Sequence, residues 1–202
     1  NDFVIYDQDD SKMLVRNVIR ELQLDEKSFV PKAVQAQISG AKNQMISPEV
    51  MANTVDGFLD EKISDIYTQY QISLKANNAL DFDDLLLKPL ELFLENPNRL
   101  EYYQNKYQYV LVDEYQDSNF IQSKWLNLLA KKKNNICCVG DDDQSIYSWR
   151  GAEIRNFLDF SKNYKNTKII KLEQNYRSTQ NILGAASGLI AKNNDRLGKK
   201  LW

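Results

Sequence analysis

An apolar run that ends in two adjacent acids constrains the fold of this chain more than any other feature. Residues 109–112 are Tyr-Val-Leu-Val, and Asp113 and Glu114 follow directly. Such a run, without polar alternation, is typical of a parallel strand buried on both faces. In open α/β sheets the reactive groups gather beyond the carboxyl ends of the strands. Paired carboxylates there suit a Mg²⁺-nucleotide site, although two acids can also simply open a loop.

Two further apolar runs repeat this arrangement. Residues 136–139 end at Gly140 and three aspartates, and residues 168–172 end in a polar loop. Helical patterns at 120–130 and 152–160 separate the three runs. Strands that alternate with helices predict an α/β fold with a parallel sheet covered by helices.

The first 77 residues predict helices, and no strand pattern competes there. The acids before Ser11, Pro31, and Ser47 followed by proline all fit helix starts. Apolar side chains then recur at helical spacing, for example from Val55 to Leu74. We therefore expect an all-α subdomain that packs on itself.

Two more helices are predicted outside this region. One covers residues 81–94, and Pro89 inside it predicts a kink or a break near Lys88. The side chains expected to point inward are Leu85, Leu86, Leu90, Phe93 and Leu94. The other covers residues 179–192, with Ser178 or Thr179 as its cap.

Several segments then resemble a known family. Residues 113–117 (Asp-Glu-Tyr-Gln-Asp), 139–152 and 172–179 resemble motifs II, III and IV of superfamily 1 DNA helicases, most closely the UvrD/PcrA/Rep group. Residues 79–86 also resemble a segment of that family, and the similarity runs in order along essentially the whole chain. Three long motifs at family-like spacing are far more specific than one acidic strand end.

The resemblance implies a domain plan. Residues 1–77 would be the helical subdomain 1B, residues 78–175 the C-terminal part of the RecA-like motor domain 1A, and residues 176–202 the start of motor domain 2A. The expected fold class is thus α/β, with an incomplete RecA-like parallel sheet that lacks its P-loop strand and with an all-α inserted subdomain.

The resemblance also implies the ligands and a role for each motif residue. ATP and Mg²⁺ would be the cofactors, and the partners would be single-stranded DNA and junctions of single- and double-stranded DNA. Catalysis would use Glu114, which polarises water beside Mg²⁺, with Gln144 as γ-phosphate sensor and Arg177 as arginine finger. Asp113 and Glu114 would hold the metal, Tyr176 would pack on adenine, Tyr147, Trp149 and Arg150 would contact DNA, and Gln116 and Asp117 would couple the sites.

The chemistry is consistent with these roles. Phosphoryl transfer needs positioning and charge neutralisation, which carboxylates and an arginine supply. Aromatic rings hold single strands without reading sequence, and such stacking is worth about 1–3 kcal/mol per base. In an extended chain Tyr147 and Trp149 share a face. An isolated Tyr-x-Trp is more often ordinary packing, and an isolated Arg177 could equally be a surface ion-pair partner; only their motifs favour the functional roles.

A phosphate-binding loop is missing from the sequence. Among the seven glycines no two are five residues apart, so there is no Gly-x4-Gly-Lys-Ser/Thr motif. We therefore expect an internal fragment of a larger helicase that neither binds ATP tightly nor hydrolyses it alone. A strand edge exposed in the fragment predicts self-association, substitution by a local segment or marginal solubility.

Composition limits the kinds of catalytic site, metal site and cellular location that are expected. There is no histidine, which excludes His-based catalysis and disfavours a Zn²⁺ site. Cys137 and Cys138 are adjacent in a predicted buried strand, so they are expected to be reduced core thiols. A net charge of −2 argues against general adhesion to nucleic acid. No apolar run approaches a membrane span, and we expect a bacterial cytosolic or nucleoid location.

Two other classes of protein stay open. One is a helicase-like subunit of a nuclease-helicase, and the other is a non-catalytic interaction module. Intact Asp113, Glu114, Gln144 and Arg177 speak against a decayed motor. The family implies movement 3′ to 5′ in DNA repair or replication, but the sequence itself gives neither the polarity nor the pathway.

Overall fold

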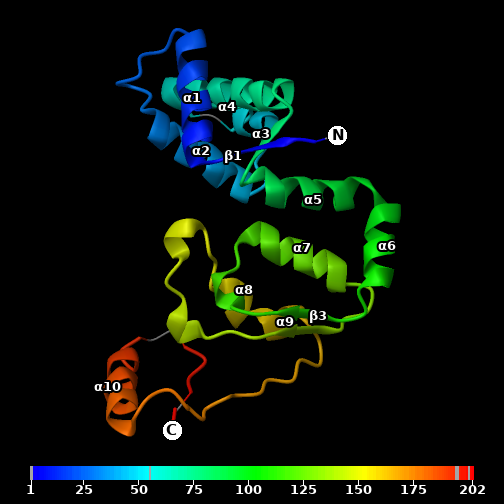
Figure 1. The fold of residues 1–202 in the computed structure, drawn as a ribbon, viewed down its shortest axis with the longest axis vertical. Coiled ribbons are helices and arrows are strands. Elements are labelled where there is room, and N and C mark those ends of the chain that lie inside the picture. The colour runs from blue at the N-terminus through cyan, green and yellow to red at the C-terminus, as the bar shows by residue number, and fades with distance from the viewer. Residues whose placement is uncertain (1, 55, 194–195, 200) are drawn as a thin grey trace. The chain divides into compact units, whose positions relative to one another are not determined.

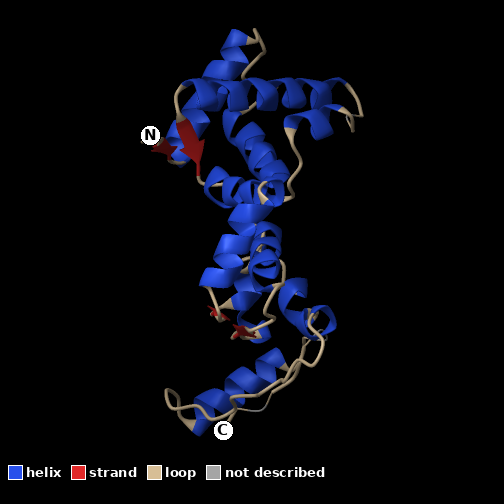
Figure 2. Cartoon of the chain, turned by 90° about the vertical axis from the view of Figure 1, so that its right-hand side faces the viewer, coloured by secondary structure: helices blue, strands red, loops and turns tan. Residues whose placement is uncertain are grey.

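The computed structural model describes residues 2–54, 56–193, 196–199 and 201–202 of the chain (Figure 1). The chain divides into two compact units, Asn1–Lys106 with Phe120–Leu129 and Tyr107–Asn119 with Ala130–Trp202. Most elements are helices, and each unit holds one short parallel strand pair, red in Figure 2. The mixed α/β class predicted from the sequence is therefore confirmed.

The first unit contains a strand pair that the sequence does not reveal. Strand β1 (Val4–Tyr6) pairs in parallel with β2 (Ala79–Asp81). The expectation that no strand lies in the first 77 residues, and hence of a purely helical subdomain, is wrong. Three residues are too few to show strand periodicity, and Val4 and Ile5 are exposed rather than alternating.

The first two helices begin at residues that favour a helix start. Helix α1 (Gln8–Glu21) is capped by Asp7, whose carboxylate accepts N–H groups of the first turn, while the Asp10 carboxylate accepts the Asp7 N–H. This reciprocal capping box satisfies donors that the helix itself leaves free. Helix α2 (Pro31–Asn43) has Pro31 in its first turn, as predicted.

The third helix also begins at its predicted start. The Ser47 hydroxyl accepts the Val50 N–H at 3.3 Å and caps the short helix α3 (Pro48–Ala52). Helix α4 (Phe58–Ala76) follows as the longest helix in the described chain. The predicted start of its apolar stripe, Val55, lies outside the described residues.

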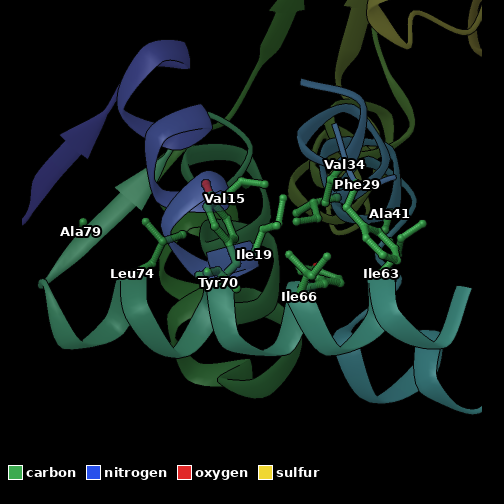
Figure 3. Packing of buried hydrophobic residues seen from close by; sticks show 13 residues of the cluster. Val15, Ile19, Phe29, Val34, Ala41, Ile63, Ile66, Tyr70, Leu74 and Ala79 are labelled. Atoms are coloured by element: carbon green, nitrogen blue, oxygen red, sulfur yellow. The ribbon is translucent and has the colours of Figure 1, made fainter. Parts of the chain in front are cut away.

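The core of the first unit lies between α4 and the helices α1 and α2. Figure 3 shows Ile66 and Tyr70 of α4 pointing toward Val15 and Ile19 of α1, with Val34 of α2 nearby. Burial of each large apolar side chain stabilises the fold by roughly 1.5–3 kcal/mol. The cluster comprises Val15, Val18, Ile19, Phe29, Val34, Ile38, Ala41, Ile63, Ile66, Tyr67, Tyr70, Leu74 and Ala79.

Three further helices complete the first unit. They are α5 (Asp84–Glu95), α6 (Pro97–Lys106) and α7 (Phe120–Ala130), and the bounds of α7 match the prediction. The Trp125 ring stacks near Phe93 with centroids 6.3 Å apart. The predicted apolar side of α7 therefore packs inward.

Helix α5 differs from its prediction in three ways. It begins at Asp84 because β2 occupies the preceding residues, and it continues through Pro89 without a break. The proline costs one backbone hydrogen bond, but Leu87 and Leu90 are buried on either side of it and hold the helix together. Leu94, expected to point inward, is exposed.

The second unit holds the strand pair that the motifs predict. Strand β3 (Val110–Val112) pairs in parallel with β4 (Ile136–Cys138). Burial on both faces, however, is not observed, because Leu111 is 79% exposed. Within the described residues β3 pairs only with β4, so its other edge has no strand beside it.

Neither of the two cysteines forms a disulfide, and only Cys138 is partly buried. Cys137 is exposed, so the expectation that both are core thiols is wrong for this residue. Cys138 is half-buried, and burial together with the neighbouring Cys137 raises the pKa of its thiol to about 12. Side chains on a strand alternate faces, which keeps the two thiols apart.

The predicted third strand is not formed. Residues 168–172 have no strand conformation, and Ile170 and Leu172 are exposed. A strand needs a hydrogen-bonded neighbour, and the described residues offer no strand beside this segment. The β-branched residues of this run favour a strand, but without a neighbouring strand they do not form one.

The helices of the second unit are short. In place of one helix at 152–160 there are two, α8 (Arg155–Leu158) and α9 (Phe160–Asn163). Helix α10 (Gln180–Ile190) confirms the last predicted helix, with Thr179 at the cap position but without a side-chain cap bond. No helix in the described ranges is long and apolar enough to cross a membrane.

Candidate functional site

The ends of β3 and β4 bring two motif loops together in the second unit. The strands are parallel, with Val112 opposite Cys138, so the loops that follow them leave the same edge. The Val139 carbonyl accepts the Tyr115 N–H at 3.0 Å and extends this contact beyond the strands. Asp113 and Glu114 therefore lie at the strand edge that sequence analysis predicts, and both are exposed.

Glu114 has an unusual backbone conformation. Its φ and ψ are 51° and 39°, in the left-handed region, immediately before the 3-10 turn η1 (Tyr115–Asp117). A residue with a side chain pays a steric cost there, and such residues cluster at functional sites. The turn is held by the Asp113 carboxylate, which accepts the Glu114 N–H at 2.9 Å.

Gln116 connects the two loops from a buried position. Only 1% of the residue is exposed. Its Nε2 donates to Glu114 Oε2 at 2.8 Å and to Asp117 Oδ2 at 3.3 Å, and its Oε1 accepts the Asp141 N–H at 3.0 Å. The amide therefore fixes the Glu114 carboxylate relative to the loop after β4.

Gly140 makes room for this amide. A Cβ at position 140 would lie 2.6 Å from Gln116 Oε1 and 2.9 Å from the Phe157 ring. Both distances are shorter than real Cβ contacts, so a side chain would displace one of the two neighbours. The close approach of Gln116 and Phe157 thus explains why a glycine, and no larger residue, ends the second apolar run.

Gln144 is held by the same loop. It ends the 3-10 turn η2 (Asp142–Gln144), and its Nε2 donates to Asp141 Oδ2 at 2.7 Å. Asp141 therefore contacts Gln116 through its backbone and Gln144 through its carboxylate. Asp141 was not among the predicted site residues, although its place directly after Gly140 was the available signal.

Of the two aromatic residues, Trp149 lies in another 3-10 turn, η3 (Ser148–Arg150), and Tyr147 directly precedes this turn. The rings of Tyr147 and Trp149 are 6.3 Å apart between centroids and tilted by 47°, and Trp149 is 73% exposed. The segment is not extended as expected, but the rings are neighbours nonetheless. The side chain of Arg150 lies outside what the structure describes.

Tyr176 and Arg177 lie in an exposed turn. Tyr176 is 84% exposed and its hydroxyl donates to Gln174 Oε1 at 2.8 Å, while the Arg177 N–H donates to Asn175 Oδ1 at 2.9 Å. In the described chain no hydrogen bond or ion pair joins this turn to Glu114. The structure thus assembles motifs II and III but leaves the two motif IV residues separate from them.

Carboxylates that could hold a metal occur twice. Asp113 and Glu114 are the predicted pair, and Mg²⁺ prefers such oxygen ligands. Asp141, Asp142 and Asp143 also offer oxygens that all lie within 4.8 Å of one another. This second cluster was not predicted as a metal site.

One groove lies within the first unit. It has a volume of about 580 Å³ and is lined by residues that include Phe3, Gln71, Asp84 and Lys88. None of the residues lining this groove belongs to motifs II, III or IV. Here the motifs, not the cavity, locate the candidate site.

Motifs II and III in this order, meeting at parallel strand ends, define the chain as DNA-helicase-like. Comparison with family models agrees, because residues 1–165 match the UvrD/REP helicase N-terminal domain. The chain belongs to this helicase family.

Curated relatives carry helicase names. The chain is 46% identical over 200 residues to the ATP-dependent DNA helicase PcrA of Bacillus subtilis and 47% identical over 203 residues to a probable DNA helicase II homolog of Rickettsia felis. The PcrA of Leuconostoc citreum is also 46% identical over 200 residues. These matches cover 99–100% of this chain but only 27–31% of the relatives.

Proposed function

We propose that this chain is the part of an ATP-dependent DNA helicase that orients water for ATP hydrolysis and links that step to single-stranded DNA. The observation that carries the proposal is the contact path from Glu114 through Gln116 and Asp141 to Gln144. It joins the water-orienting residue of motif II to the phosphate-sensing residue of motif III. The helicase names of the relatives support the same activity.

The hydrolytic roles follow from position and chemistry. Mg²⁺ neutralises phosphate charge when bound, and the exposed carboxylates of Asp113 and Glu114 are suited to hold it. Glu114 orients the attacking water, and Gln116 fixes that carboxylate by its hydrogen bond. Fixed geometry matters because phosphoryl transfer depends on positioning more than on covalent chemistry.

The DNA-binding roles fall to exposed aromatic rings. Tyr147 and Trp149 offer adjacent faces on which bases of single-stranded DNA stack. Arg150 follows them and would neutralise a phosphate. Because η3 follows Gln144 after only three residues, the nucleotide state and the DNA contact share one loop.

The remaining roles belong to motif IV and the domain plan. Tyr176 would pack on adenine and Arg177 would reach the γ-phosphate, with residues 176–202 as the start of domain 2A. Residues 1–77 and 78–175 would be subdomain 1B and part of a RecA-like domain 1A. The whole protein would act 3′ to 5′ in DNA repair or replication, on single strands and junctions, in the bacterial cytosol or nucleoid.

The isolated chain is proposed to be inactive. It has no phosphate-binding loop, whose amides and lysine are needed to cradle the nucleotide. The β3–β4 pair has no further strand beside it in the described residues, and Leu111 is exposed. We expect the isolated chain to self-associate through this edge.

A hybrid protein tests the function. In it, this chain replaces the matching 200 residues of the Bacillus subtilis PcrA. We expect ATP hydrolysis that single-stranded DNA stimulates, and loss of turnover in Glu114→Gln, whereas Glu153→Gln, an exposed acid of the same unit, stays active. A folded but silent hybrid would favour the non-catalytic interaction module.

A further inference from the structure

The acidic loop after β4 is bound by a basic segment from the C-terminal end of the chain. The Arg196 guanidinium donates to both Asp143 oxygens, from Nε at 2.6 Å and from a terminal nitrogen at 2.5 Å. Both side chains are mostly buried. A two-pronged, charge-assisted contact of this kind is among the stronger and more directional hydrogen bonds.

Two further contacts complete this arrangement. The Leu197 N–H donates to Asp142 Oδ2 at 2.8 Å, and the Lys199 ammonium pairs with the Asp141 carboxylate. Each of the three consecutive aspartates therefore has its own partner on residues 196–199. We call residues 196–199 the basic clasp.

The charges of the clasp explain how three adjacent carboxylates coexist. Burial acts to raise the pKa of Asp141, but its hydrogen bonds from Lys199 and Gln144 outweigh burial and hold the pKa below its ordinary value. Asp143 in turn raises the pKa of Arg196. The clasp thus contacts the same three carboxylates that lie close enough to one another to hold a divalent cation.

The clasp is connected to the catalytic path through one residue. Asp141 accepts from both Lys199 and Gln144, and its N–H donates to Gln116. Gln116 holds Glu114. Moving the clasp would therefore release the carboxylate that orients Gln144 and shift the loop that anchors Gln116.

We propose that Arg196 and Lys199 are positioning residues that hold the loop of residues 141–144 in its hydrolytic geometry. The proposal rests on the proposed function for its catalytic consequence, but the contact itself can be tested without it. Lys199 pairs with the same Asp141 carboxylate that accepts from Gln144, so displacement of the clasp would loosen the hold of that carboxylate on Gln144.

The first test measures amide hydrogen exchange in the 202-residue chain. In Arg196→Glu, the amides of Asp143 and Gln144 exchange at least about tenfold faster, because both charge-assisted hydrogen bonds from the guanidinium to Asp143 are lost. The swapped pair Arg196→Asp with Asp143→Arg restores slow exchange. Arg155→Glu, an exposed arginine of α8, leaves these amides unchanged. Unaltered exchange in Arg196→Glu would overturn the clasp.

The second test measures ATP turnover in the hybrid protein. Arg196→Glu lowers kcat about tenfold with an unchanged KM for ATP, because the lost orientation affects hydrolysis and not binding. The swapped pair recovers kcat. Arg196→Lys, which keeps the charge, has a kcat between those of the wild type and Arg196→Glu. Faster exchange with unchanged kcat would overturn the positioning role. A silent wild-type hybrid would count against the proposed function and leave the exchange result to decide the clasp.

Discussion

Lys42 and Asp81 form an ion pair inside the first unit, with 2.6 Å between Nζ and Oδ2 and a fully buried lysine side chain. The lysine lies in the last turn of α2, and the aspartate ends β2 and precedes α5. Asp84 lies 3.0 Å from the same ammonium, and the Tyr70 hydroxyl donates to Asp81 at 2.8 Å. One cation therefore ties together the helix, the strand and the segment 79–86 that sequence analysis singled out.

Replacing the cation is expected to destabilise the first unit strongly. Lys42→Met leaves two buried carboxylates without their partner, and breaking a buried pair costs about 3–5 kcal/mol. Urea unfolding followed by circular dichroism measures the loss. The matched control is Lys32→Met, an exposed lysine of the same helix. A loss below about 1 kcal/mol would show that the pair is not a structural tie.

Asp83 is expected to make the stability of the first unit depend on pH. Burial, with the nearby Asp81 charge, raises its pKa above 3.8, although hydrogen bonds from Ser39 and Asn43 and the Lys42 charge act in the opposite direction. The folded state then binds the proton more tightly than the unfolded state, so this group's contribution to stability falls as pH rises from about 3.8 through the raised pKa.

Replacing Asp83 by asparagine removes the carboxyl group that titrates. We expect Asp83→Asn to gain stability relative to wild type as pH rises across that window, because the amide stays neutral and can still accept from Asn43. Unfolding curves for both proteins at a series of pH values measure the difference. A constant difference at all pH values would contradict the raised pKa.

Two glycine substitutions separate steric need from helix propensity. Gly140→Ala should destabilise the second unit by about 1–3 kcal/mol, because the new methyl group overlaps Gln116 and Phe157. Gly184→Ala, exposed within α10 with no atom near the added Cβ, should stabilise by about 0.5–1 kcal/mol. Thermal unfolding of the two variants checks this, and equal shifts would refute the crowding at position 140.

Truncation of the exposed indole should weaken DNA binding. In the hybrid protein, Trp149→Ala is expected to weaken binding of a single-stranded oligonucleotide about 5- to 150-fold, which corresponds to about 1–3 kcal/mol of stacking. Fluorescence anisotropy measures it at fixed salt. Trp202→Ala, another exposed tryptophan of this unit, should bind normally. Equal affinities for all three proteins would rule out the stacking role.

Sequence predicts those parts of the structure whose cause is local. The start of α2 at Pro31, the bounds of α7, and the acids at the end of β3 follow from caps, periodicity and an apolar run. These signals act within a few residues. They hold whatever surrounds the segment.

The failures share a different cause. The run 168–172 has strand propensity but no neighbouring strand in the described chain, and the pairing of Val4 with Ala79 joins residues far apart in sequence. The contact of Arg196 with Asp143 is equally distant. Long-range pairing decides these features, and a single sequence contains no local trace of it.

Strand displacement by the hybrid protein tests the helicase function most directly. We predict that the hybrid separates a duplex with a 3′ single-stranded tail when ATP is present, and that it fails on a 5′-tailed duplex. Glu114→Gln should bind the same DNA and displace nothing. Displacement that persists in Glu114→Gln, or a folded, ATP-hydrolysing hybrid that separates neither duplex, would contradict the account.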